Sequence, residues 1–247
     1  MGARITGKHG GNEKFDESGK RHPGNMREFD AEVARRSIYL DFEGEGRNDR
    51  SCHPLPHMAG IFRPDPVKGG GGEYEAVFFR EAWTAPVNGS REKSRIASFA
   101  ETIAGLIEEA KARDSLICFW SEHELGVIKA NAPELADAFE AVGFNLLPPL
   151  RTIKNRYRWR LDKSSGKGLN QYLELFLEKR PRVSEIQPGP AEACRRVDRA
   201  CGTHGRWKNW PENKKEYVRN LIRYNKEDCK STWLLGRKLG NINSGSR

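Results

Sequence analysis

The sequence predicts an α/β domain in which helices flank a mixed β-sheet. Short apolar runs of strand length recur in the first third of the chain, at 37–42, 58–63 and 74–80. A segment whose apolar residues have helical spacing, 90–111, then leads to another short apolar run at 115–119. Alternation between these two patterns is typical of α/β domains, and 247 residues suffice for one domain with a sizeable core.

The first three strands are expected to open the sheet in antiparallel order. The segment between the second and third runs contains Pro64, Pro66 and four consecutive glycines, Gly69–Gly72. Proline and glycine favour turns, so this segment is predicted to be a long hairpin connection.

Helices are expected to follow the third strand. Within 90–111, the apolar residues with helical spacing are Ile96, Phe99, Ile103, Leu106 and Ile107. Two further helices are predicted at 122–130 and 133–142, and Pro133 suits a first helical turn.

The second half of the chain is predicted to contain one more strand and three helices. The strand is expected at 145–150, at a sheet edge, because its two consecutive prolines cannot donate ladder hydrogen bonds. The helices are expected at 169–177, around 191–200, and at 213–239.

Both ends of the chain lack the apolar periodicity of a folded element. Residues 1–33 are predicted to form a disordered basic arm, and residues 241–247 a flexible tail. The folded domain is therefore expected to span 34–240.

The chain carries a formal net charge of +9 and has a pI of about 9.4. This charge favours a polyanionic partner such as DNA or RNA, although solubility alone is an alternative role. The five cysteines and the lack of a signal peptide argue against a disulfide framework. No run approaches eighteen apolar residues, so we expect no membrane span and a cytoplasmic protein.

Acidic residues occur at two widely separated places with a shared geometry. Asp41 and Glu43 are two apart on a predicted strand and point to one face. Tyr224 and Asp228 are four apart on a predicted helix and also share a face. If the fold brings these faces together, the clustered carboxylates need a cation, and hard oxygen ligands suit Mg²⁺ or Mn²⁺.

An Asp-x-Glu strand combined with a Tyr-x-x-x-Asp helix resembles the DEDDy branch of the DEDD exonucleases. The resemblance implies a ribonuclease H-like (DnaQ-like) fold and a metal-dependent 3′–5′ exonuclease. It implies that two Mg²⁺ or Mn²⁺ ions are held by four carboxylates, and that Tyr224 orients the attacking water. The implied metal ligands are Asp41, Glu43, Glu124 and Asp228.

The third acid of the resemblance falls on one of two residues. Glu124, followed by Ile128 four residues later, fits the spacing of the family motif best, and Glu122 is the alternative. The family often has Asp at this position, and the longer Glu side chain reaches about one carbon further.

A strongly basic segment with interleaved aromatics follows the predicted fifth strand. Lys and Arg neutralise phosphates and aromatic rings stack on unpaired bases, so a nucleic-acid-binding role is proposed. An exposed, charged connection is the alternative interpretation. The candidate binding residues are Arg151, Lys154, Arg156, Tyr157, Arg158, Trp159 and Arg160.

The expected substrate is DNA or RNA that is single-stranded or has a free 3′ end. Two alternatives are a catalytically weak nucleic-acid-binding module and a subunit of a larger nucleic-acid-processing machine with protein partners.

Overall fold

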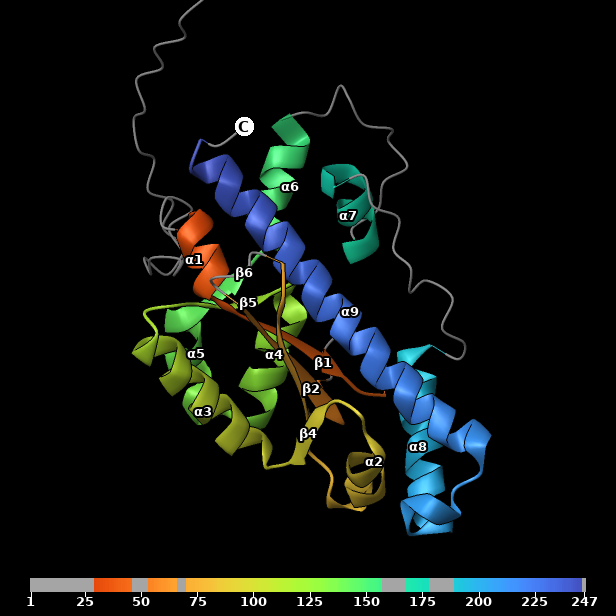
Figure 1. Ribbon diagram of the computed structural model, residues 1–247. Coiled ribbons are helices and arrows are strands. Elements are labelled where there is room, and N and C mark those ends of the chain that lie inside the picture. Colours follow the sequence, from red (N-terminus) through yellow and green to blue (C-terminus); the bar gives the residue numbers. More distant parts are fainter. Residues whose placement is uncertain (1–28, 46–52, 66–69, 157–167, 178–188, 246–247) are drawn as a thin grey trace, which may run out of the picture.

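The computed structural model describes residues 29–45, 53–65, 70–156, 168–177 and 189–245. Within these residues, six strands form one mixed sheet that is flanked by helices (Figure 1). This is the α/β class that the sequence predicts, and it is compatible with a ribonuclease H-like fold.

The strand order across the sheet is β4-β3-β2-β1-β5-β6. The first three strands pair in antiparallel fashion, as predicted, whereas β4, β5 and β6 each pair in parallel with a neighbour. The strands are β1 (Ile38–Glu43), β2 (Met58–Pro64), β3 (Gly72–Phe78), β4 (Lys93–Ile96), β5 (Ile117–Phe119) and β6 (Gly143–Asn145).

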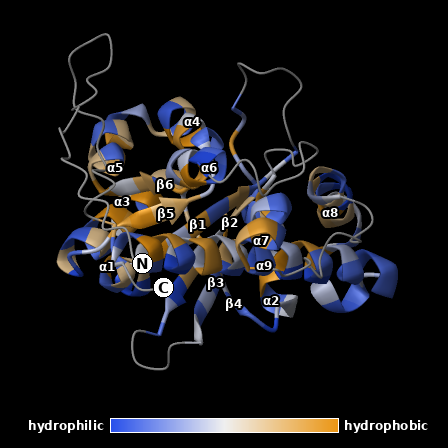
Figure 2. Ribbon diagram, turned by 90° about the horizontal axis from the view of Figure 1, so that it is seen from above, coloured by the Kyte–Doolittle hydropathy of each residue, from blue (hydrophilic) through white to orange (hydrophobic). Residues whose placement is uncertain are grey.

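Helices cover the sheet on both faces, as the view from above shows (Figure 2). The α-helices are α1 (Ala31–Arg36), α2 (Thr84–Gly89), α3 (Phe99–Ala112), α4 (Glu122–Asn131), α5 (Ala136–Val142), α6 (Leu147–Arg156), α7 (Leu169–Leu177), α8 (Pro190–His204) and α9 (Glu212–Asn243). Short 3₁₀ turns are η1 (Glu81–Trp83), η2 (Pro133–Leu135) and η4 (Trp207–Asn209). Among the described helices, none combines the length and the apolar character needed to cross a membrane.

Strand β1 divides the apolar core into two halves. Its even-numbered residues, such as Ile38 and Phe42, pack with α3, α4 and α5 on one face. Tyr39 points to the other face and packs into the core that includes α8 and α9. Because side chains alternate along a strand, Asp41 and Glu43 share the α9 face with Tyr39.

The helix expected at 90–111 begins later than predicted. Residues Lys93–Ile96 form the edge strand β4, and α3 starts at Phe99. The side chain of Ser98 caps α3 by accepting a hydrogen bond from the backbone N–H of Glu101. Ile96 fits the apolar spacing of the helix, but it lies before this cap and therefore belongs to the sheet.

The strand expected at 145–150 was also misplaced. The chain forms β6 two residues earlier, at Gly143–Asn145, and then enters α6 at Leu147. The two prolines thus lie in the first turn of a helix, where the missing N–H has no intrahelical partner to lose. Asn145 supports this start because its Oδ1 accepts from the N–H of Leu147 at 3.0 Å.

The folded domain extends beyond the boundaries predicted at both ends. Phe29 is fully buried and stacks on Phe144 with ring centroids 4.3 Å apart. Asp30 caps α1, which packs on α9, so residues 29–33 are not part of a disordered arm. The side chain of Asn243 donates to the carbonyl of Phe29 at 2.8 Å, which joins the predicted tail to the domain. Residues 1–28 and 246–247 lie outside the described part of the chain.

Candidate metal centre

Carboxylates from β1 and α9 converge at the end of β1. Oxygen atoms of Asp41, Glu43 and Asp228 all lie within 4.8 Å of one another. Glu43 is buried, whereas Asp41 and Asp228 are partly exposed. The structure therefore brings together three of the four acids that the sequence predicts as metal ligands.

The acids in this cluster hold their protons more tightly than acids in water. Burial, followed by the charges of Glu43 and Asp228, raises the pKa of Asp41 well above its usual range. Burial and the charge of Asp228 raise the pKa of Glu43 to about 8, and burial raises the pKa of Asp228 to about 7. A cation among the three carboxylates would favour their charged forms.

A buried amide holds one of these carboxylates in place. The side chain of Asn225 has no exposed surface, and its Nδ2 donates to Oδ2 of Asp41 at 2.7 Å. The Oδ1 of Asn225 accepts from the hydroxyl of Tyr74 at 2.9 Å. The Tyr74–Asn225–Asp41 chain of hydrogen bonds therefore fixes the orientation of the Asp41 carboxylate.

Gly60 makes room for this amide. It pairs with Asp41 across β1 and β2. A Cβ atom at this position would lie 1.6 Å from Oδ1 of Asn225. Neither residue is among the predicted site residues, although Asn225 stands directly after Tyr224, and a glycine inside a strand indicates close approach of another group.

Glu124 lies near the cluster but is directed at its own helix. Its Oε2 accepts from the N–H and the hydroxyl of Ser121, at 3.1 and 3.2 Å, and so completes a capping box on α4. Its charge also contributes to the raised pKa values of Asp41 and Glu43. Glu122 is exposed, so Glu124 is the better placed of the two candidates for the third acid.

Tyr224 lies beside the carboxylates on α9. Its pKa is raised by burial and by the charges of Asp228, Glu43 and Asp41, and it hydrogen-bonds with Asp228. The phenol therefore stays protonated at neutral pH, which suits a group that orients a water rather than one that removes a proton.

The predicted nucleic-acid-binding segment is only partly described. Arg151, Lys154 and Arg156 lie on α6, where the two arginines are exposed. Lys154 places its Nζ 5.0 Å from the centroid of the Tyr172 ring. The remaining candidates, Tyr157, Arg158, Trp159 and Arg160, fall outside the described residues.

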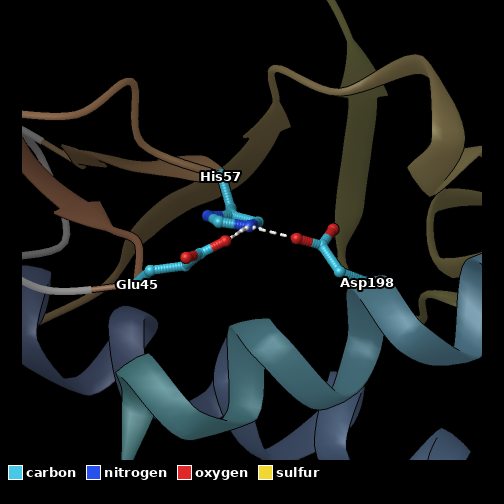
Figure 3. A group of neighbouring side chains, drawn as sticks. All are labelled: Glu45, His57 and Asp198. Atoms are coloured by element: carbon cyan, nitrogen blue, oxygen red, sulfur yellow. Dashed lines mark hydrogen bonds and ion pairs between the residues drawn. The ribbon is translucent and has the colours of Figure 1, made fainter.

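A second polar cluster, which the sequence did not predict, lies just beyond the end of β1. Its members are Glu45, His57 and Asp198 (Figure 3). His57 Nε2 lies 2.7 Å from Asp198 Oδ2 and 3.6 Å from Glu45 Oε1. Figure 3 shows Asp198 on a helix, α8, opposite the imidazole.

Asp198 already has a cation and two further partners. Arg80 lies 2.9 Å from Oδ2 of Asp198, and the indole N–H of Trp83 donates to Oδ1 at 2.6 Å. Because Arg80 supplies the positive charge, the cluster is explained as an anchor that ties α8 to the start of β2.

The donor set at the first cluster fits Mg²⁺ or Mn²⁺. These ions prefer carboxylate oxygens, and Asp41, Glu43 and Asp228 present such oxygens close together. No protein-family model, curated protein or solved structure matches this chain. Only the residues of the site itself therefore point to a function.

Proposed function

We propose that this protein is a metal-dependent phosphodiesterase that acts on nucleic acid as a 3′–5′ exonuclease. The observation that supports the proposal best is the convergence of Asp41, Glu43 and Asp228, with oxygens within 4.8 Å. The net charge of +9 favours a polyanionic substrate.

The residues of the site would have three roles, which are metal binding, orientation of a water and positioning of a carboxylate. Asp41, Glu43 and Asp228 would hold two divalent ions, and Glu124 would complete the ligand set. Such ions lower the pKa of a water and neutralise charge on the phosphate. Tyr224, protonated and next to Asp228, would orient the attacking water. Asn225 would keep Asp41 directed at the site through its 2.7 Å hydrogen bond.

The test is cleavage of end-labelled single-stranded DNA and RNA with Mn²⁺ or with chelator. Asp41→Ala should abolish cleavage and leave strand binding unchanged or tighter, because a negative charge is lost. Tyr224→Phe should reduce the rate less. Asp137→Ala, which removes an exposed carboxylate on α5, is the control and should cleave like the parent. Normal cleavage by Asp41→Ala would refute the assigned centre.

The direction of attack can be tested separately. A 3′-phosphate should block digestion, whereas a blocked 5′ end should not. Cutting of a closed single-stranded circle would show an endonuclease and exclude the exonuclease part of the proposal.

One observation favours a second candidate, a nucleic-acid-binding module with weak catalysis. The carboxylate of Glu124 is occupied by the capping box on α4. For this candidate, Mn²⁺ titration would show weak binding, and Glu124→Gln would leave the residual rate unchanged. For an active exonuclease, the same substitution should lower the rate strongly, whereas Glu122→Gln should not.

A further inference from the structure

A cationic hollow lies between α8 and the beginning of α9. It has a volume of about 470 Å³, and most of its lining comes from one side of α8. Its lining residues are Glu192, Arg196, Arg199, Ala200, Thr203, His204 and Lys214.

The positive charge in this hollow exceeds the negative charge. Among the described residues that line it, Glu192 is the one carboxylate, and it lies 2.9 Å from Nε of Arg196 and 3.1 Å from Nη2 of Arg199. Arg195, next to the hollow, also binds Glu192 at 2.9 Å. A single carboxylate neutralises one of these three guanidinium groups, and Lys214 adds a further cation.

Tyr217 holds two of the cations close together. The guanidinium carbon of Arg196 lies 5.0 Å from the ring centroid of Tyr217, and the Nζ of Lys214 lies 5.5 Å from it. Arg196 also donates to the Tyr217 hydroxyl at 2.7 Å. Like charges gathered in this way repel each other, so an anion in the hollow would be bound favourably.

Arg199 is the most accessible of these cations. Its side chain is 70% exposed, so it can turn toward a ligand without leaving a buried partner unpaired. Guanidinium groups bind phosphate oxygens in a two-pronged geometry, and ammonium groups bind them as point charges.

The hollow and the candidate metal centre lie along one stripe of α9. Lys214, Tyr217, Tyr224 and Asp228 belong to one unbroken helix. Asp228 lies fourteen positions after Lys214, which is about four turns, so these two residues lie on nearly the same face, about 21 Å apart.

We infer that this hollow binds backbone phosphates of the nucleic-acid strand whose end lies at the metal centre. The choice of a strand as ligand rests on the proposed function. The distance of about 21 Å corresponds to about six nucleotides at the rise of one duplex strand. The hollow thus gives long substrates a contact that very short ones cannot reach.

The test measures binding of a fluorescent 20-nucleotide single strand in chelator, across a range of salt concentrations. Arg199→Glu with Lys214→Glu should weaken binding on the order of tenfold at low salt and reduce the salt slope by about 1.4, since each phosphate contact contributes about 0.7. A trinucleotide should bind parent and variant equally. The neutral variant, Arg199→Gln with Lys214→Gln, should show the same change to a smaller extent.

The matched control is Lys111→Glu with Lys129→Glu. Both lysines are about half exposed and pair with a glutamate, at 2.9 and 2.5 Å, but they lie on α3 and α4. The control should leave the salt slope close to that of the parent. A slope that is unchanged in both hollow variants, or equally reduced in the control, would overturn the inference.

Two further outcomes are decisive. Displacement of the strand by inorganic phosphate at an equal phosphate concentration would show a small-anion site and overturn the inference. Because binding is measured in chelator, its result is independent of cleavage. If the hollow variants bind normally while Mn²⁺-dependent cleavage persists, the inference fails and the proposed function stands. If the hollow variants bind weakly but neither the parent nor any variant cleaves with Mn²⁺, the proposed function fails and the inference about the hollow stands.

Discussion

At the scale of single residues, the Asp41 carboxylate depends on a glycine in the neighbouring strand. Gly60 leaves the space that Oδ1 of Asn225 occupies, and Asn225 in turn donates to Asp41. The position of a candidate metal ligand is therefore set by a residue that contributes no side chain.

Gly60→Ala should destabilise the protein and disturb the metal centre. The added Cβ would lie 1.6 Å from Oδ1 of Asn225, so helix α9 or the amide must move. We expect a loss of about 1–3 kcal/mol in the free energy of unfolding, measured by urea denaturation. The control is Gly105→Ala on α3, where, among the described residues, nothing beyond the backbone of its own helix and its two chain neighbours lies within 4 Å of the new Cβ. It should be neutral or stabilising by up to about 1 kcal/mol.

A companion double variant separates crowding from a general defect of the strand. Asn225→Ala removes the closest contact of the new Cβ and leaves Sγ of Cys229 at 2.9 Å, so Gly60→Ala should cost less stability in the Asn225→Ala background than in the parent. If Gly60→Ala costs as much stability in the Asn225→Ala background as it does in the parent, the explanation by steric conflict with Asn225 is wrong.

The acids should make the stability of the metal-free protein fall as the pH rises. Glu43 and Asp228 have pKa values raised to about 8 and about 7, above those of an unfolded chain. The folded state therefore binds more protons than the unfolded state between about pH 4 and pH 8, and stability is lost across this interval. We expect a loss of at least about 2 kcal/mol, measured by urea denaturation in chelator at several pH values.

Asp228→Asn supplies the comparison for the pH experiment. It removes one carboxylate from the cluster, so its stability should fall less steeply with pH than that of the parent. Burial lowers the pKa of His57, which has the opposite sign of effect, but this contribution is common to both proteins. Mg²⁺ or Mn²⁺ should stabilise the parent most at high pH. If the free energy of unfolding in chelator changed equally with pH in the parent and in Asp228→Asn, the carboxylates of the cluster would not destabilise the folded state when they ionise.

At the scale of elements, the carboxylate of Asp198 links helix α8 to residues on or beside β2 and η1. Asp198 accepts from His57, Arg80 and Trp83, which lie on or next to β2 and η1. Glu45, two residues beyond Glu43, lies 3.6 Å from His57 and is also an acceptor for Arg195 through its carbonyl at 3.0 Å. The anchor therefore lies directly beyond the strand that carries two of the candidate ligands.

Asp198→Ala should weaken the protein by about 2–3 kcal/mol, because it leaves the indole N–H and the imidazole without their partner. The change would appear as a lower midpoint in urea with an unaltered slope. Glu216→Ala, which removes an exposed partner of Arg219 on α9, should change stability by less than about 0.5 kcal/mol. A loss that is equally small for Asp198→Ala would mean that packing alone holds α8.

Elements with a strong periodic pattern could be predicted from the sequence. Their boundaries were predicted less accurately. The helix at 169–177 and the antiparallel start of the sheet are confirmed. The strand β4 was missed because Ile96 continues the helical spacing, and only the cap at Ser98 separates the two elements. The prolines of α6 were assigned to a strand edge because helix starts and edges tolerate proline equally well.

The candidate site was predictable where it depends on local geometry. The spacing of Asp41 and Glu43 on a strand, and of Tyr224 and Asp228 on a helix, already places each pair on one face. His57 and Asp198 meet across 141 positions of sequence, and no local pattern indicates such a contact. For Gly60, a glycine inside a strand indicates that another group approaches closely, but no local pattern identifies that group as Asn225.

At the scale of the whole molecule, helix α9 connects the cationic hollow, the candidate metal centre and residues 29–31. It extends over 32 residues, about 48 Å, and packs against α1, α7, α8 and the sheet (Figure 1). Its beginning borders the cationic hollow, its middle carries Asn225 and Asp228, and its end contacts residues 29–31.

Phe29→Ala should show that residue 29 belongs to the folded unit. The ring is fully buried against Phe144, so its loss should lower the free energy of unfolding by about 3 kcal/mol or more. Leu55→Ala is the control, since Leu55 is 39% exposed and should contribute little. Thermal or urea unfolding measures both. A change below about 0.5 kcal/mol for Phe29→Ala would place the start of the domain further along the chain.

Because α9 is one continuous helix, the number of residues between the hollow and the acids fixes the angle between them about the helix axis. One residue inserted between Lys215 and Arg223 would rotate Lys214 by about 100° about the helix axis relative to Asp228, while it changes their separation by only about 1.5 Å. An insertion of seven residues, close to two turns, would nearly restore the phase and lengthen the separation by about 10 Å. The distance between the hollow and the acids can therefore change without separating their faces only by insertions or deletions close to whole helical turns.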